Sequence, residues 1–161
     1  MAAVNSLYTA GATAISPTKG LVAGGRNAAG QIFTNLYIYD SATQQFSHTN
    51  NLDPSDYIVC GSVQGEAELL VICAGGWVDG QKTRHAYKFD HAIQGLVRKL
   101  EWDLPVGMDG YIRVSGDRLF FIYGADAWKF IETPADGVHW KHLPGIVGAG
   151  EPIAVQLSYL A

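Results

Sequence analysis

The chain has 161 residues, of which 48% are apolar and 16% charged, and a formal net charge of −4. This length fits one domain, and the apolar content is that of a folded globular protein rather than of a disordered chain. No basic run is present, so nucleic acid is not expected as a partner. No apolar run approaches the roughly 20 residues of a membrane-spanning helix. The first basic residue is Lys19, which makes the N-terminal stretch a poor signal peptide, and a cytoplasmic location is expected.

The predicted elements belong to a repeat. The apolar run 21–23 ends in Gly24-Gly25, and a similar run ends in Gly75-Gly76, 51 residues later. Segment 35–40 (Asn-Leu-Tyr-Ile-Tyr-Asp) has a counterpart 50 residues later (His-Ala-Tyr-Lys-Phe-Asp). A weaker third copy covers 119–131, and each unit closes on a leucine near a proline, at residues 52–54, 104–105 and 143–144. Markers in a fixed order at a period near 50 residues are typical of a repeat architecture.

The runs predict short β-strands. They hold four to six residues, are bounded by Gly or Pro and are rich in β-branched and aromatic side chains. They barely alternate, which indicates burial on both faces of a sheet. Gly116-Asp117 predicts a tight hairpin between Ser115 and Arg118. Because no window of about a dozen residues keeps a helical period, the predicted fold class is all-β.

The double glycine, the aromatic-Asp strand and the apolar fourth strand make residues 12–143 resemble the kelch-repeat family. This resemblance implies a β-propeller made of four-stranded antiparallel blades. Blade 1 would cover about 12–49, blade 2 about 58–102 and blade 3 about 111–143, with 153–160 starting a further blade or closing the ring. Propellers typically have 4–8 blades, and three blades leave uncovered faces. A homo-oligomer, or a place in a larger propeller, is therefore expected.

No convincing catalytic or metal-binding motif is found. His139 and His142 are three residues apart on a predicted strand, so they point to opposite faces and cannot share a metal ion. Cys60 and Cys73 fall on paired strands, and a turn centred on residues 65–66 makes them miss each other by one pair. Free buried thiols are therefore expected, although a shift in register would allow a disulfide. No catalytic residue, metal or cofactor is expected, and the chain is not predicted to be an enzyme.

The kelch resemblance implies a binding rim made of the loops that follow the second and fourth strands of each blade. Those loops are segments 26–34, 77–84, 125–126, 50–57, 103–110 and 145–150. Loops on a rigid scaffold often carry function. Side-chain types that are enriched at interfaces, or that suit an acidic partner, predict partner contacts at Arg26, Tyr57, Trp77, Lys82, Arg84 and Met108. The expected function is a non-catalytic interaction module or scaffold that binds a protein partner.

Two other functions stay open. A lectin-like propeller would use Trp77 or Trp128 to stack on a sugar ring, but it should repeat its site in each blade. The loop between the second and third strands of blade 3 is shorter by eight residues than that of blade 2. An enzyme of the copper-radical-oxidase type would need a Tyr–Cys pair and two histidines. The chain has only two cysteines, both in mid-strand, so this function ranks last.

Overall fold

The computed structural model describes residues 8–49, 55–65, 67–133 and 137–143. No α-helix occurs among them, so the all-β prediction is confirmed. One short 3-10 turn, η2 (Leu100–Trp102), precedes the last four strands. The strands are β1 Gly11–Ser16, β2 Lys19–Ala23, β3 Leu36–Asp40, β4 Gln45–Thr49, β5 Val59–Gln64, β6 Leu69–Ala74, β7 Trp77–Val78, β8 Gln81–Lys82, β9 Ala86–Asp90, β10 Gly95–Arg98, β11 Tyr111–Ser115, β12 Arg118–Tyr123, β13 Asp126–Thr133 and β14 Gly137–His142.

In the described part of the chain these strands form three four-stranded antiparallel sheets and one two-stranded ribbon. Sheet 1 has the order β1-β2-β3-β4, sheet 2 the order β5-β6-β9-β10 and sheet 3 the order β11-β12-β13-β14. The ribbon β7-β8 is inserted between β6 and β9 of sheet 2. Each sheet is therefore completed by one continuous stretch of sequence.

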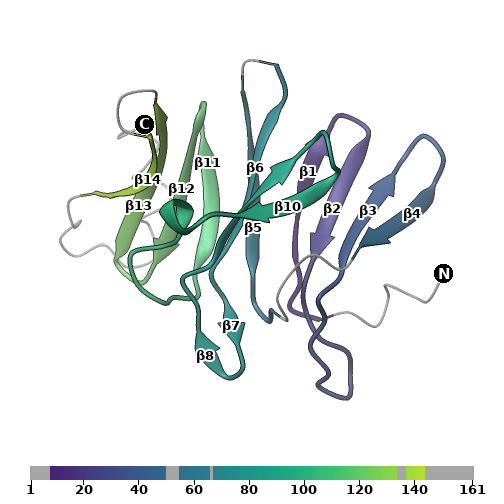
Figure 1. Cartoon of the computed structure of the whole chain (residues 1–161), viewed down its shortest axis with the longest axis horizontal. Helices are drawn as coiled ribbons and strands as arrows, with labels where there is room; N and C mark the ends of the chain where they lie inside the picture. The colour runs from purple at the N-terminus through teal and green to yellow at the C-terminus, as the bar shows by residue number, and fades with distance from the viewer. Residues whose placement is uncertain (1–7, 50–54, 66, 134–136, 144–161) are drawn as a thin grey trace.

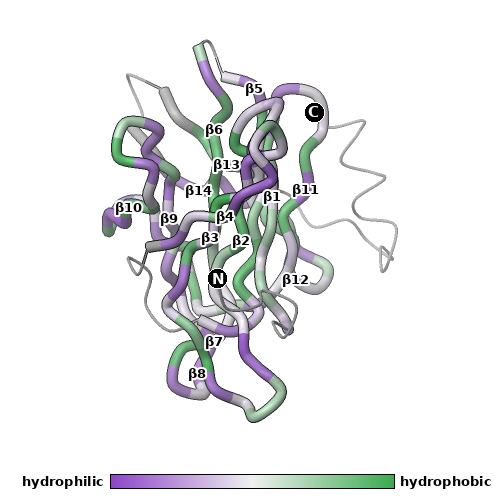
Figure 2. The backbone as a smooth tube through the Cα atoms, turned by 90° about the vertical axis from the view of Figure 1, so that its right-hand side faces the viewer, coloured by the Kyte–Doolittle hydropathy of each residue, from purple (hydrophilic) through white to green (hydrophobic). Residues whose placement is uncertain are grey.

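The three sheets stand side by side like a fan, with sheet 2 in the middle (Figure 1). β5 contacts both β1 and β11, so the first strands of the sheets are neighbours. On β6, Val71 packs into the core shared with sheet 1, whereas Ile72 packs into the core shared with sheet 3. Adjacent residues on a strand point to opposite faces, so sheet 2 is buried on both sides, as its unbroken apolar runs predicted. Figure 2 shows β2 and β6 as apolar stretches inside the molecule.

The double glycines let the chain approach its neighbours closely. Gly24-Gly25 has φ values of 66° and 92°, and Gly75-Gly76 repeats them at 69° and 90°. A Cβ on Gly75 would lie 2.6 Å from the carbonyl oxygen of Met108, and one on Gly76 would lie 2.5 Å from that of Asp56. Only glycine fits a positive φ beside such contacts.

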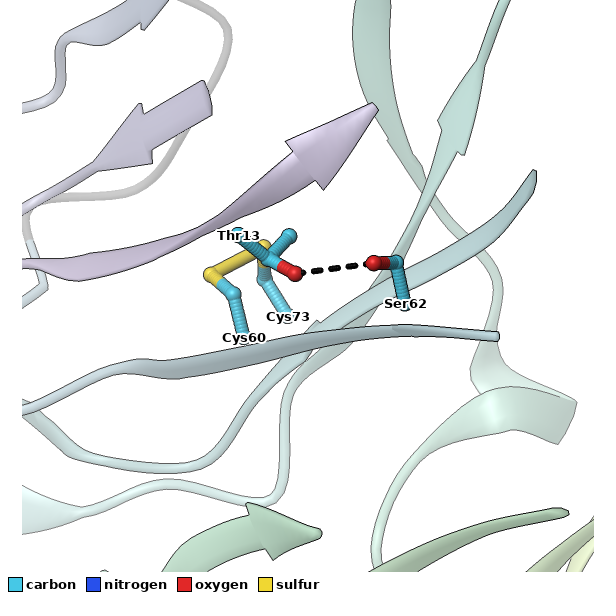
Figure 3. The surroundings of a disulfide bond; sticks show 4 residues. All are labelled: Thr13, Cys60, Ser62 and Cys73. Carbon is cyan, nitrogen blue, oxygen red and sulfur yellow. Dashed lines mark hydrogen bonds between the residues drawn. A yellow bond between two sulfur atoms is a disulfide. The ribbon is translucent and has the colours of Figure 1, made fainter. Parts of the chain in front are cut away.

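Two predictions about turns had opposite outcomes. The tight hairpin is confirmed, because Ser115 pairs with Arg118 across Gly116-Asp117. The prediction of free thiols is wrong, because Cys60 and Cys73 face each other directly and form a disulfide (Figure 3). The β5–β6 connection holds the four residues 65–68 between its last pair, rather than the expected two. The longer connection shifts the pairing of β5 with β6, so that Cys60 lies opposite Cys73.

Some expectations fall outside the described residues: the strand at 153–160, the loop 145–150 and the first part of the loop 50–57. Within the described ranges, no helix is long and apolar enough to cross a membrane.

Candidate functional site

The loops that follow β2 and β6 meet the segments that precede β5 and β11 along one edge of the fan, at the bottom of Figure 1. Backbone hydrogen bonds fix this edge: the N–H of Gly25 donates to the Ser55 carbonyl at 2.7 Å, and the N–H of Gly76 donates to the Met108 carbonyl at 3.0 Å. Each bond ties one sheet to the segment leading into the next. We call this edge the rim.

The first polar group on the rim is built around the buried carboxylate of Asp56. It accepts hydrogen bonds from the Thr9 hydroxyl and from the Tyr57 backbone N–H, and its Oδ2 lies 3.9 Å from Nε of Arg26. The guanidinium carbon of Arg26 lies 5.7 Å from the centroid of the Tyr57 ring, a cation–π distance. Asp56 therefore fixes a cation and an exposed aromatic ring side by side.

The second polar group has the same components. Nζ of Lys82 lies 3.1 Å from Oδ1 of Asp109 and donates to the Tyr123 hydroxyl at 2.7 Å. The indole N–H of Trp77 donates to Oδ2 of Asp109 at 3.1 Å. The ring centroids of Trp77 and Tyr123 lie 5.6 and 4.8 Å from the ammonium group of Lys82.

These contacts favour the charged form of both partners of the second pair. The hydrogen bond to Tyr123 and then that to Asp109 raise the pKa of Lys82 above its ordinary value. Burial by itself raises the pKa of Asp109, but hydrogen bonds from Lys82 and Trp77, together with the charge of Lys82, outweigh burial and lower it.

The two groups are equivalent in the repeat. Arg26 follows β2 of sheet 1 and pairs with the aspartate before β5 of sheet 2. Lys82 lies in the corresponding β6–β9 connection of sheet 2 and pairs with the aspartate before β11 of sheet 3. A cation, a carboxylate and an aromatic ring thus recur at each junction between sheets.

A hollow of about 450 Å³ opens between the two groups. Aliphatic residues form part of its lining, together with the polar and aromatic residues Thr9, Tyr57, Asp109, Tyr111 and Tyr123. Aromatic rings and hydroxyl groups suit an amphipathic ligand group, which can stack on a ring and form hydrogen bonds.

Four of the six predicted contact residues meet on the rim: Arg26, Tyr57, Trp77 and Lys82. Arg84 is exposed, and its Nε donates to the Leu104 carbonyl at 2.8 Å, so it links two loop segments. Met108 departs from the prediction, because its side chain is fully buried in the core between sheets 2 and 3. Its backbone is held against Gly76 and Thr83 by hydrogen bonds, and its apolar side chain lies in the core instead of on the rim.

The sequence interpretation missed the carboxylates that organise the rim. Asp56 and Asp109 each stand two residues before a predicted first strand, at 58 and 111, and this common position was an available signal. Tyr111 and Tyr123 were assigned to strands only, although they lie at the strand ends that border the hollow.

The described residues contain no group of three His, Cys, Asp or Glu side chains that could hold a metal ion. His142 contacts Asp126 at 3.1 Å, and His139 pairs with Ile131 on the other face of β14. Both cysteines are used in the disulfide, so neither is available for a Tyr–Cys pair.

No protein-family model matches this chain, and no curated protein matches it. Among solved structures, that of YjhT is similar, with a TM-score of 0.66 and 14% sequence identity. The match covers 89% of this chain and 53% of YjhT, so the chain spans about half of that structure. At this identity the likeness concerns the fold alone.

Proposed function

We propose that this chain is part of a kelch-type β-propeller that binds a protein partner through the rim and catalyses no reaction. Three features support the propeller: the repeat near 50 residues, the meander order of each sheet and the neighbouring first strands β1, β5 and β11. In a propeller, four-stranded blades surround a central axis in this manner.

The observation that carries the binding function is the convergence of Arg26, Tyr57, Trp77 and Lys82 from separate loops. Two carboxylates, Asp56 and Asp109, hold them in place. Side chains that are already ordered lose less conformational entropy when a partner binds. Tyr57 is 46% exposed, and tyrosine, tryptophan and arginine are the types that dominate interface energies.

The hollow beside these residues fits a protein partner that inserts one side chain between the tyrosine rings. The cations are already paired with aspartates, so the binding energy would come mainly from the aromatic rings and from hydrogen bonds. Binding should therefore depend only weakly on salt concentration.

The test compares two double variants in affinity capture followed by titration of the captured protein. Tyr57→Ala/Trp77→Ala removes two rim rings and should weaken binding at least about tenfold, because truncating a hot-spot residue costs roughly 2 kcal/mol. Ile93→Ala/Leu100→Ala is the matched control, since those apolar side chains are 64% and 75% exposed away from the rim. Equal affinity for both variants and the parent would refute the rim as the site.

A carbohydrate-binding function is the second candidate. It is favoured by the three tyrosine rings around the hollow and by the recurrence of the cation–carboxylate–aromatic group at two junctions. A glycan array distinguishes the two functions: a bound glycan that Tyr57→Ala releases would support the lectin, and an array without binding would favour the protein partner.

We also propose an oxidising compartment in place of the cytoplasmic location expected from the sequence. Disulfides persist in oxidising compartments and are rare in the reducing cytosol, and Cys73 is fully buried in its bond to Cys60. Alkylation of the protein in lysates quenched with acid tests this proposal, and free thiols on both cysteines would contradict it.

A further inference from the structure

The fourth strand of sheet 1, β4, forms an open edge. In the described part of the chain it pairs with β3 alone, and Figure 1 shows it as the outermost strand of its sheet, at the right of the fan. Its residues Gln45 to His48 are all exposed. An edge strand leaves a row of backbone N–H and C=O groups without a partner strand, and these groups can pair with another extended chain.

The equivalent edges of the other two sheets are protected. β10 ends in Arg98, and its Val97 packs against the core that contains Trp102 of η2. β14 carries Lys141 beside the buried Trp140. Charged side chains, proline and covering elements keep edges from pairing. β4 reads Gln-Phe-Ser-His-Thr, with no Lys, Arg, Asp, Glu or Pro, so it lacks the charges that the other two edges carry.

A hollow of about 470 Å³ opens beside β4 on the side that faces sheet 2. Ser47 pairs with Ile38, which packs in the core shared with sheet 2, so Ser47 points to the same side. Gln45 lies two residues earlier on the strand and shares this face. Gln94, from the turn between β9 and β10, also lines the hollow. The hollow therefore lies between the edge of sheet 1 and the outer hairpin of sheet 2.

The lining of the hollow is mostly polar, and its opposite charges balance. It contains one lysine and one aspartate, Lys19 and Asp40, which are direct neighbours on paired strands. Asp40 in turn pairs with Gln45, so the three side chains form one row across β2, β3 and β4. Because the two charges lie side by side, the hollow favours no ion of either sign. It suits an uncharged segment.

We propose that β4 receives an extended peptide segment of a protein partner as a fifth strand of sheet 1. In this mode of recognition, backbone hydrogen bonds give affinity and pockets for alternate side chains give specificity. Residues of the segment opposite Gln45 and Ser47 share their face and enter the hollow. An aliphatic side chain opposite Ser47 packs towards Ile38, and an uncharged polar one opposite Gln45 meets the row of Lys19 and Asp40.

This site is separate from the rim. The rim follows the end of β2 at Ala23, whereas Lys19 stands at the beginning of that strand. The hollow therefore extends to the opposite end of sheet 1 from the rim, towards the top of Figure 1. The inference goes beyond the proposed function, because it requires neither the rim residues nor a closed propeller.

The test selects a random octapeptide library, displayed on phage, against the whole chain. Enriched peptides are synthesised with a fluorescent label, and their affinity is measured by fluorescence polarisation. They should alternate aliphatic and other residues and contain no central proline, which cannot donate to a ladder. Methylating one backbone nitrogen at a time should weaken binding only at every second position, because alternate N–H groups of a strand point to opposite edges.

Two variants of β4 locate the bound peptide. Ser47→Lys places an ammonium group in the hollow and should weaken binding at least about tenfold. His48→Lys is the matched control, since it adds the same charge to the next residue, which points to the other face. Its affinity should stay within about twofold of the parent's. Circular dichroism melts establish that both variants are folded.

The inference is overturned if no peptide is enriched, if Ser47→Lys binds as tightly as His48→Lys, or if methylation shows no alternation. A parent that dimerises until Ser47→Lys is introduced would also overturn it, because a second copy would then occupy the edge. Peptides that bind Ser47→Lys but not the rim variant Tyr57→Ala/Trp77→Ala would refute only this inference. Peptides that bind the rim variant but not Ser47→Lys support it, whatever the rim itself binds.

Discussion

Lys82 and Asp109 form an ion pair of 3.1 Å that joins sheet 2 to the segment leading into sheet 3. The same pair orients a cation between the rings of Trp77 and Tyr123 on the rim. One contact therefore both ties neighbouring sheets together and prepares a surface for binding. The ion pair between Arg26 and Asp56 likewise joins sheet 1 to the segment leading into sheet 2, and Arg26 lies over one ring, that of Tyr57.

The Lys82–Asp109 pair should make stability depend on pH in acid. The pKa of Asp109 is lowered in the fold, so its contribution is present above its ordinary value of 3.8 and is lost as pH falls below it. The pKa of Lys82 is raised, so its contribution is present below 10.5 and is lost as pH rises above that value. Asp109→Asn should lower the melting temperature at pH 7, and the difference from the parent should shrink towards pH 3.

Asp117→Asn serves as the control for this measurement. Asp117 also contacts an arginine, Arg118, but its side chain is 83% exposed, and such surface pairs contribute little. Its melting temperature should follow the parent at every pH. A gap between Asp109→Asn and the parent that is constant from pH 7 to pH 3 would show that the ion pair does not supply the stability.

Gly76 should tolerate no side chain. Gly76→Ala places a Cβ 2.5 Å from the Asp56 carbonyl oxygen, at a φ of 90° that L residues avoid. Backbone strain and overpacking each cost roughly 1–3 kcal/mol, so we expect a loss of about 3 kcal/mol in the free energy of unfolding, measured by urea denaturation.

Gly30→Ala separates the two causes. Its φ of 83° is similar, but a Cβ there meets nothing within 4 Å, so it should cost only the strain of about 1–2 kcal/mol. Equal losses for the two variants would mean that close approach to Asp56 is unimportant.

The disulfide should stabilise the fold by restricting the unfolded chain. Cys60 and Cys73 are 13 residues apart, and closing a loop of this size contributes about 3 kcal/mol. Cys60→Ala/Cys73→Ala should therefore unfold at lower urea concentration than the parent. Reductant should lower the urea midpoint of the parent towards that of the double variant and leave the midpoint of the double variant unchanged. A parent midpoint that reductant does not change would argue against the bond.

The sequence was sufficient where local chemistry decides the structure. Gly116-Asp117 specifies its own hairpin, and the apolar run of β6 predicts burial on both faces. The register of Cys60 and Cys73 was missed because Gly65 does not determine turn length, and two additional residues in the connection realign the strands.

The candidate site was predicted only in part for a different reason. The types of Arg26 and Lys82 indicated a binding rim, but their partners Asp56 and Asp109 belong to the next sheet. Such long-range pairs depend on how sheets pack and leave little local signal. Met108 was predicted on the rim but is buried. Methionine is common both at interfaces and in cores, so its residue type alone does not distinguish the two positions.

The contact between sheets 2 and 3 offers a last prediction that depends on a single methyl group. A Cβ built on Gly61 of β5 would overlap Cγ2 of Ile112 on β11, so Gly61→Ala should destabilise the chain by roughly 1–3 kcal/mol through overpacking. Ile112→Ala alone should cost about 2–5 kcal/mol, because it leaves a cavity. In the double variant the new methyl group occupies part of that cavity, so its loss should be smaller than the sum of the two single losses by about 1 kcal/mol or more.

Ile112→Val is the matched control: it keeps both branches at Cβ, so it should not relieve Gly61→Ala. Urea denaturation of the five variants and the parent measures these differences, and strict additivity in both pairs would contradict the direct contact between Gly61 and Ile112.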